Sequence, residues 1–167
     1  MAQEAVDVRN LPMIPDARIA ILRSKWYSDI VGSMHSKCEQ LLIKRGAVVE
    51  THVLPGTLEF PYAAQMLAEN DFDLEAIICL SVVVKGETHH FDMIIDSCIQ
   101  GLTRVARDSL IVVINEILPV VDIEHARARA ADDEFNKGIE AAAAAIEMVD
   151  WTRRYAPGIS DDTVEFH

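Results

Sequence analysis

Four short segments of the chain are almost continuously apolar and rich in isoleucine and valine. They are ARIAILR (17–23), AVVETHVL (47–54), LEAIICLSVVV (74–84) and SLIVVINEIL (109–118). Most of them do not alternate between apolar and polar residues. Strands with continuous apolar character are buried on both faces, which is typical of a parallel sheet covered by helices. The pattern therefore predicts four buried parallel strands.

The segments between these strands place apolar residues three and four positions apart, as amphipathic helices do. This spacing predicts helices over 28–45, 58–70 and 90–107, and two more over about 122–133 and 136–154. Right-handed crossovers between parallel strands place such helices on both faces of one sheet. We therefore predict an α/β fold, a three-layer sandwich around a four-stranded parallel sheet.

The length of 167 residues suits one domain with a hydrophobic core and is short for two. No internal repeat or linker interrupts the pattern. Residues 1–15 contain two prolines without clear periodicity, and the segment from residue 156 opens with a Pro-Gly break and turns acidic. We expect an N-terminal arm (1–15), one α/β domain (16–155) and an acidic C-terminal tail (156–167).

Charge and composition narrow the possible partners and location. A net charge of −12 disfavours nucleic acid and anionic membranes as general partners, because both are negatively charged. The three cysteines have no CxxC spacing, which indicates reduced core residues. No signal peptide is recognisable, and no apolar run approaches about 18 residues. These features predict a cytoplasmic protein.

Ligands of open α/β sheets bind beyond the carboxyl ends of the strands. The loops at that edge read SKWYSD, PGTLEFP, KGETHHF and LPVVD. They are expected to bring together the side chains of Trp26, Glu59, Lys85, Thr88, His89 and His90. A Gly-Glu-Thr turn at a helix start offers free backbone N–H groups and the positive end of the helix dipole, which suit a phosphate or carboxylate. Histidine beside such an anion can move protons near neutral pH.

Several of these residues also have a purely structural interpretation. Thr88 can cap the helix that follows it, and Trp26 can equally belong to the core. Glu59 can complement the dipole of the helix that it starts. Adjacent histidines on a helix point about 100° apart, so they suit a shared metal ion poorly and no metal site is expected.

Three segments resemble the signature regions of the lumazine synthase family, in the same order and at similar spacing. They are PGTLEFPYAA (55–64), VVVKGETHHFD (82–92) and NKGIEAAAAAIEM (136–148). The resemblance runs from about Arg18 to about Met148. It implies a flavodoxin-like sheet in a homopentamer, sometimes assembled further into decamers or sixty-subunit shells.

The resemblance also implies a reaction. The family condenses 5-amino-6-(D-ribitylamino)uracil with 3,4-dihydroxy-2-butanone 4-phosphate in riboflavin biosynthesis, giving 6,7-dimethyl-8-ribityllumazine, phosphate and water. The reaction needs no cofactor and no metal. The implied partners are therefore the two small-molecule substrates, phosphate and neighbouring subunits of the same chain.

By the same resemblance, one set of residues holds the pyrimidine ring and the ribityl chain: Trp26, Thr57, Leu58, Glu59, Val83 and Val84. The indole stacks on the pyrimidine, the carboxylate holds ribityl hydroxyls, and the other members bind through backbone groups. Where many family members have asparagine after the aromatic residue and a Phe-Gly pair in the fourth strand, this chain has Tyr27 and the pair Asn115 and Glu116. The wall facing the ring is therefore changed.

A second set is implied for phosphate binding and proton transfer. Glu87 and Thr88 match the phosphate cradle, and His90 matches the proton-transfer residue. Lys137 and Glu140 match a charged pair near the phosphate, although residues three apart on a helix also pair with each other.

Arg129 matches an arginine that reaches the phosphate from a neighbouring subunit. The usual Gly-Thr-Lys-x-Gly segment after this arginine reads AADDEF here, with Asp133 at a position where lysine is frequent. Arg127 is therefore an alternative phosphate ligand, and assembly into a shell is less expected.

Two other functions remain possible at this point. One is a catalytically weak family member that binds a lumazine or a flavin, which the changes at Asn115, Glu116 and Asp133 would favour. The other is a flavodoxin-like carrier of FMN. That class needs a Ser/Thr-rich phosphate loop after the first strand, where this chain has the bulky SKWYSD.

Overall fold

The computed structural model describes residues 4–156 and contains one four-stranded sheet. Its strands are β1 (Arg18–Ser24), β2 (Val48–Leu54), β3 (Leu74–Val84) and β4 (Val112–Val120). All three pairings are parallel, in the order β2-β1-β3-β4. The predicted four-stranded parallel sheet is therefore confirmed.

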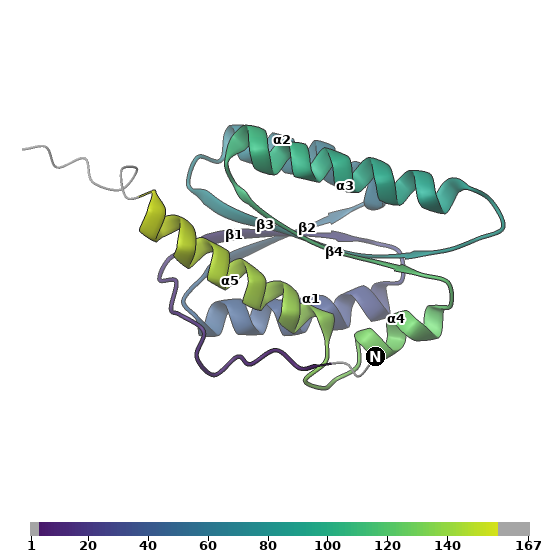
Figure 1. Ribbon diagram of the computed structural model, residues 1–167, viewed down its shortest axis with the longest axis horizontal. Helices are drawn as coiled ribbons and strands as arrows, with labels where there is room; N and C mark the ends of the chain where they lie inside the picture. The colour runs from purple at the N-terminus through teal and green to yellow at the C-terminus, as the bar shows by residue number, and fades with distance from the viewer. Residues whose placement is uncertain (1–3, 157–167) are drawn as a thin grey trace, which may run out of the picture.

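Helices cover both faces of this sheet (Figure 1). On one face lie α1 (Ser28–Lys44), α4 (Ile123–Arg129) and α5 (Lys137–Tyr155). The opposite face carries the short 3₁₀ helix η1 (Thr57–Glu59), followed by α2 (Phe60–Asn70) and α3 (His90–Ser109). This arrangement confirms the three-layer α/β sandwich and places two separate hydrophobic clusters on the two faces of one sheet.

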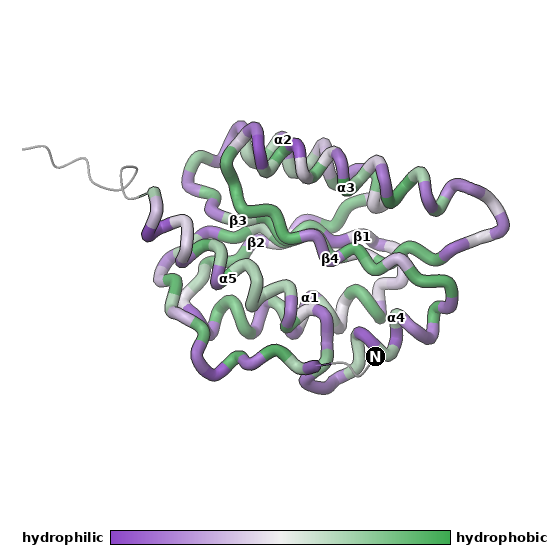
Figure 2. Tube along the Cα trace, viewed as in Figure 1, coloured by the Kyte–Doolittle hydropathy of each residue, from purple (hydrophilic) through white to green (hydrophobic). Residues whose placement is uncertain are grey.

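Burial differs between the central and the edge strands. β1 and β3 are almost fully buried, as continuous apolar strands should be. Figure 2 shows this hydropathy along the trace, with the strongly hydrophobic segments concentrated in the sheet between the helical layers. β2 is an edge strand whose residues are all at least partly exposed, so the prediction of burial on both faces was wrong for this strand. Its polar centre, Glu50 to His52, is where the apolar run breaks.

Two element boundaries also differ from the predictions. The helix expected to reach residue 133 ends at Arg129, because residues 130–136 form a tight turn. The strand expected from residue 109 begins at Val112, because α3 continues to Ser109 and Leu110 then adopts a left-handed conformation with φ of 51°. Local apolar content does not distinguish the last turn of a helix from the start of a strand.

The segment before β1 packs against the domain. Leu11 and Ile14 are buried in the cluster under α1 and α5, and the Arg45 guanidinium donates to the carbonyl oxygens of Leu11 and Val8 at 2.8 and 2.7 Å. The part of the predicted arm from residue 4 to residue 15 therefore covers the core without forming a helix or strand. Residues 157–167 of the predicted tail lie outside the described part of the chain.

The three cysteines lie in the core, as their sequence context predicted. Cys38, Cys79 and Cys98 are all buried as free thiols, and burial raises the pKa of each. Within residues 4–156, no helix is both long and apolar enough to cross a membrane.

Helices α1 and α5 approach closely where α5 begins. A Cβ atom on Gly138 would overlap the backbone carbonyl of Met34 in α1, so only glycine fits at this crossing. We expect Gly138→Ala to lower the free energy of unfolding by about 3 kcal/mol, because backbone must move to relieve the overlap. Urea denaturation measures this change.

Gly32 in α1 supplies the matched control. A Cβ there would lie 3.4 Å from the Arg23 guanidinium, which is an ordinary contact with the end of a flexible side chain. Gly32→Ala should therefore leave stability unchanged or raise it by up to about 1 kcal/mol through helix propensity. Equal losses in the two variants would contradict the close packing at Gly138.

Candidate functional site

A cavity of about 280 Å³ opens at the carboxyl edge of the sheet. It is lined by Trp26, Pro55, Gly56, Thr57, Leu58, Glu59, Val82, Val83, His90 and Ile94. These residues come from the loop after β1, the loop and 3₁₀ helix after β2, the end of β3 and the start of α3. The edge that parallel topology indicated therefore brings together Trp26, Glu59 and His90, which are far apart in the sequence.

The aromatic residue after β1 lies at the mouth of this cavity. Trp26 is 62% exposed, so the interpretation of Trp26 as a core residue was wrong. Tyr27 is also exposed and adopts a left-handed conformation with φ of 51° immediately before α1. Tyr27 does not line the cavity, but it flanks the tryptophan at the same loop.

The loop after β2 approaches the tryptophan closely. A Cβ atom on Gly56 would lie 3.2 Å from a carboxylate oxygen of Glu59 and 3.7 Å from Nε1 of Trp26. The backbone of this loop thus passes between the indole and the carboxylate. Leu58 beside it is half exposed at the cavity wall.

Thr57 is buried and anchors this loop to the sheet. Its hydroxyl lies 2.5 Å from the Ser81 hydroxyl, which in turn donates to the Ser24 hydroxyl at 3.3 Å. The Cys98 thiol donates to the Thr57 carbonyl at 3.1 Å. The two serines were missed in the sequence analysis, although each is a polar residue within or at the end of an apolar strand.

The loop from β3 to α3 carries the predicted anion cradle. Its residues from Lys85 to His90 are exposed, and the Lys85 amide donates to the Val120 carbonyl at 2.8 Å. Among residues 4–156, no hydrogen bond uses the backbone amides of residues 86–89. The loop therefore presents consecutive free donors just before the N-terminus of α3.

Thr88 contributes little to capping of helix α3. The helix begins at His90, with His89 at the N-cap position and no side-chain cap. The hydroxyl of Thr88 accepts only a long contact of 3.4 Å from the His90 amide. Helix capping therefore accounts poorly for Thr88, and its hydroxyl remains exposed beside the loop amides.

The remaining predicted residues lie elsewhere on the chain. Arg129 ends α4, and Lys137 and Glu140 lie in the first turn of α5, so all three belong to the helical layer opposite α2 and α3. The Lys137 ammonium pairs with the Glu140 carboxylate at 2.5 Å. Asn115 is exposed on the edge strand β4, where its side-chain oxygen accepts from the Ile117 amide at 3.1 Å. None of these four residues lines the 280 Å³ cavity.

The two arginines of α4 have different partners. Arg127 pairs with Asp29 of α1 at 2.7 Å and with Glu124 at 3.4 Å. Arg129 donates only to the His125 carbonyl at 3.0 Å, and no carboxylate among residues 4–156 lies within 4.0 Å of it. Arg127 is therefore engaged within its own chain, whereas the Arg129 guanidinium is available to an external anion.

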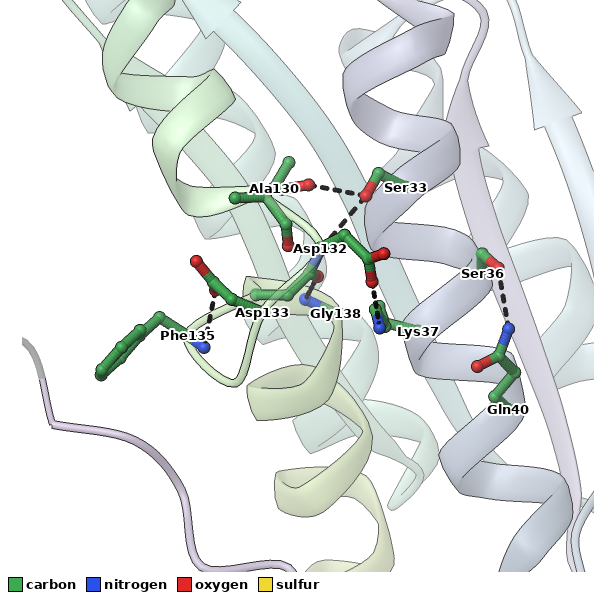
Figure 3. A network of polar contacts seen from close by, with 11 residues as sticks. Ser33, Ser36, Lys37, Gln40, Ala130, Asp132, Asp133, Phe135 and Gly138 are labelled. Atoms are coloured by element: carbon green, nitrogen blue, oxygen red, sulfur yellow. Dashed lines mark hydrogen bonds and ion pairs between the residues drawn. The ribbon is translucent and has the colours of Figure 1, made fainter.

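The turn between α4 and α5 (Figure 3) is fixed by a buried asparagine, Asn136. The Asn136 side chain accepts from the Gly138 amide at 2.8 Å and donates to the Ala131 carbonyl at 2.8 Å and the Ser33 hydroxyl at 3.3 Å. The Ser33 hydroxyl donates to the Ala130 carbonyl at 2.6 Å. Asn136 was not singled out from the sequence, although asparagine just before a helical segment is a common N-cap.

The acidic residues of this turn also have partners within the chain. Asp132 pairs with Lys37 of α1 at 2.5 Å, and the Asp133 carboxylate accepts from the Phe135 amide at 2.9 Å (Figure 3). The segment AADDEF therefore forms an ordered connection that fixes where α4 ends and where α5 starts.

A larger cavity of about 640 Å³ lies at the opposite edge of the sheet, beside the amino ends of β3 and β4. It contains none of the predicted site residues. Within the described chain, no cluster of three or more His, Cys, Asp or Glu side chains has the geometry of a metal site.

The chain is similar to proteins of one known family. A family model described as 6,7-dimethyl-8-ribityllumazine synthase matches residues 16–153. Proteins of that name from Stenotrophomonas maltophilia (strain K279a) and Xanthomonas oryzae pv. oryzae (strain PXO99A) are 38% and 36% identical to this chain. The matches cover 80% and 81% of this chain and 87% and 89% of the relatives. One from Acidovorax sp. (strain JS42) is 34% identical over 78% of this chain and 83% of its own length. The chain therefore belongs to the 6,7-dimethyl-8-ribityllumazine synthase family.

Proposed function

We propose that this chain condenses 5-amino-6-(D-ribitylamino)uracil with 3,4-dihydroxy-2-butanone 4-phosphate, forming 6,7-dimethyl-8-ribityllumazine. The observation that carries this proposal is the cavity at the carboxyl edge of the sheet, where Trp26, Glu59 and His90 meet in a member of the family. The three buried free thiols suit the reducing cytoplasm, which we propose as the location.

The cavity has the groups that a ribitylated pyrimidine requires. The exposed indole of Trp26 offers a flat apolar face for stacking, and Glu59 offers a carboxylate to the ribityl hydroxyls. Backbone groups of Thr57, Leu58 and Val83 complete the wall, and Val84 follows at the end of β3. Such fixed groups orient two substrates relative to one another, which supplies much of the acceleration of a condensation.

The β3–α3 loop supplies anion binding and proton transfer in the proposed site. The free amides of Glu87 and Thr88, with the Thr88 hydroxyl, form a cradle for the phosphate at the positive end of α3. His90 lines the cavity directly beside this cradle. Imine formation, phosphate loss and ring closure each need protons to be moved, and His90 is placed to move them.

The second group of residues completes the site from a neighbouring subunit. Arg129, Lys137 and Glu140 do not line the cavity of their own chain, yet the phosphate leaving group needs a cation. A closed ring of subunits, which we propose is a homopentamer, would bring Arg129 and Lys137 of one subunit to the His90 side of the next. We favour Arg129 over Arg127 as the phosphate ligand, because Asp29 and Glu124 already engage Arg127.

Tyr27 and Asn115 belong to the same proposed interface. Tyr27 flanks Trp26 on one side of the site, and Asn115 lies on the exposed edge of β4. Tyr27 stands where many family members have asparagine, and Asn115 stands where many have phenylalanine. We propose that they face the pyrimidine ring from the two subunits and adjust how tightly it is held.

A steady-state assay with both substrates tests the proposed function, because turnover to the fluorescent lumazine is expected. A protein that only binds a lumazine would quench the emission of Trp26 without turnover. The variant Trp26→Ala should lose that quenching and bind the product more weakly by about 1 kcal/mol, as for the loss of one stacked aromatic contact. Absence of turnover by the folded parent protein would contradict the proposal.

A further inference from the structure

A charged side chain stands on the buried face of β4. Glu116 lies two residues from Ile114 and two from Leu118, and both of these apolar neighbours pack into the cluster under α1 and α5. Because side chains of a strand alternate, Glu116 points to the same face. Its register partner in β3 is Leu80, which is fully buried in that cluster. Glu116 is itself partly buried, so this carboxyl group sits at the margin of an apolar layer.

The groups that face Glu116 come from two helices. The first turn of α5 contributes Lys137 and Glu140, which pair with each other at 2.5 Å, and α1 contributes the buried thiol of Cys38. Burial, and to a lesser degree the charge of Glu140, raises the pKa of Glu116 to about 7, while Lys137 acts in the opposite direction. Lys137 is only 21% exposed, so its charge is not fully screened by solvent.

We propose that Glu116 is a positioning residue for the Lys137–Glu140 pair, and that its loss of a proton weakens binding of the anionic substrate. With Glu116 protonated, the three side chains carry one positive and one negative charge. With Glu116 ionised, two carboxylates compete for Lys137 and the cluster becomes anionic. This inference rests on the proposed function, which places Lys137 beside the substrate phosphate.

The direction of the effect follows from the charges alone. An additional negative charge beside an anion site repels phosphate, and it also draws the Lys137 ammonium toward β4. Phosphate binding should therefore weaken as pH rises through neutrality. Because phosphate itself titrates near neutral pH, the informative quantity is the ratio between the parent and a variant that cannot ionise at residue 116.

Glu116→Gln is that variant, since glutamine keeps the shape of the side chain and stays neutral. The matched control is Glu147→Gln, which removes an exposed carboxylate from the same helix α5. The affinity for inorganic phosphate, measured by calorimetry, and KM for the butanone phosphate are compared at pH 6 and pH 8. Between pH 6 and pH 8, the phosphate affinity of the parent should fall, and its KM should rise, by about three- to tenfold more than for Glu116→Gln. This is the effect that one added unit charge near a partly solvated site predicts.

The Glu147→Gln control should lose affinity with pH just as the parent does. A parent-to-Glu116→Gln ratio that is the same at pH 6 and pH 8 would overturn the inference, as would a control that behaves like Glu116→Gln. If no variant and no parent turns over the butanone phosphate, the proposed function fails. The calorimetric comparison with inorganic phosphate still decides the role of Glu116 in that case.

Stability gives a readout that is independent of any substrate. A carboxyl group whose pKa is raised by folding stabilises the protein fully below its unfolded pKa, and that stabilisation is lost as pH rises through its folded pKa. For Glu116 this window runs from its ordinary pKa of 4.5 to about 7. The urea midpoint of the parent should therefore fall, relative to that of Glu116→Gln, between pH 4.5 and pH 7. A constant difference would overturn the inference.

The parent protein alone provides the same test if Glu116→Gln does not fold. Carboxyl carbon NMR should then show a glutamate resonance that titrates near pH 7. A spectrum in which every glutamate titrates below pH 5.5 or so, the range of ordinary carboxyl groups, would refute the proposed protonation.

Discussion

His90→Ala should lower kcat by at least about tenfold while leaving KM nearly unchanged, because a positioned acid/base group typically contributes about 10²–10⁴-fold. His90 lines the cavity at the first residue of α3, next to the free loop amides. It is thus placed to move protons while other groups hold the substrates. Steady-state kinetics with each substrate varied in turn measures both constants.

His89→Ala is the matched control for this substitution. His89 is the N-cap residue of α3 and does not line the cavity, although it is adjacent in the sequence and is also exposed. Its removal should cost much less activity. Equal losses at the two histidines would show that neither has a specific role in proton transfer.

Mixing two inactive variants should restore activity if the site is shared between subunits. His90→Ala and Arg129→Ala remove residues that lie on opposite helical layers of one chain. When the two variants are unfolded together and refolded, about one site in four combines an intact His90 from one subunit with an intact Arg129 from the next, by counting equivalent interfaces. Activity should therefore return to at most about a quarter of the parent value.

The result depends on proof that mixed rings form, which sedimentation and mass spectrometry of tagged subunits provide. Mixed rings that stay as inactive as either variant would mean that Arg129 does not act across the interface. Arg127→Ala is the natural next variant. Because Arg127 is tied to Asp29, its removal should mainly affect the packing of α4 on α1.

The hydrophobic pattern was sufficient for most of the fold, since each layer of the sandwich leaves a strong local signal. Continuous runs such as the one at β3 and the apolar stripe of α3 identified strand and helix correctly. The pattern was less informative at the edge strand β2 and at the end of α4. The exposure of β2 depends on its position at the edge of the sheet. The end of α4 depends on a turn that the Asn136 side chain fixes.

The sequence by itself determined the fold class, the four loops of the carboxyl edge and the family, because apolar periodicity and short motifs are local properties of the chain. Only the tertiary structure decided that Trp26, Glu59 and His90 share one cavity while Arg129 and Lys137 lie on another layer. The tertiary structure also gave Arg127 carboxylate partners that Arg129 lacks among residues 4–156, and it placed Glu116 on the face of the sheet that α1 and α5 cover. These features depend on contacts between residues far apart in the chain, and on the burial and charge that such contacts create.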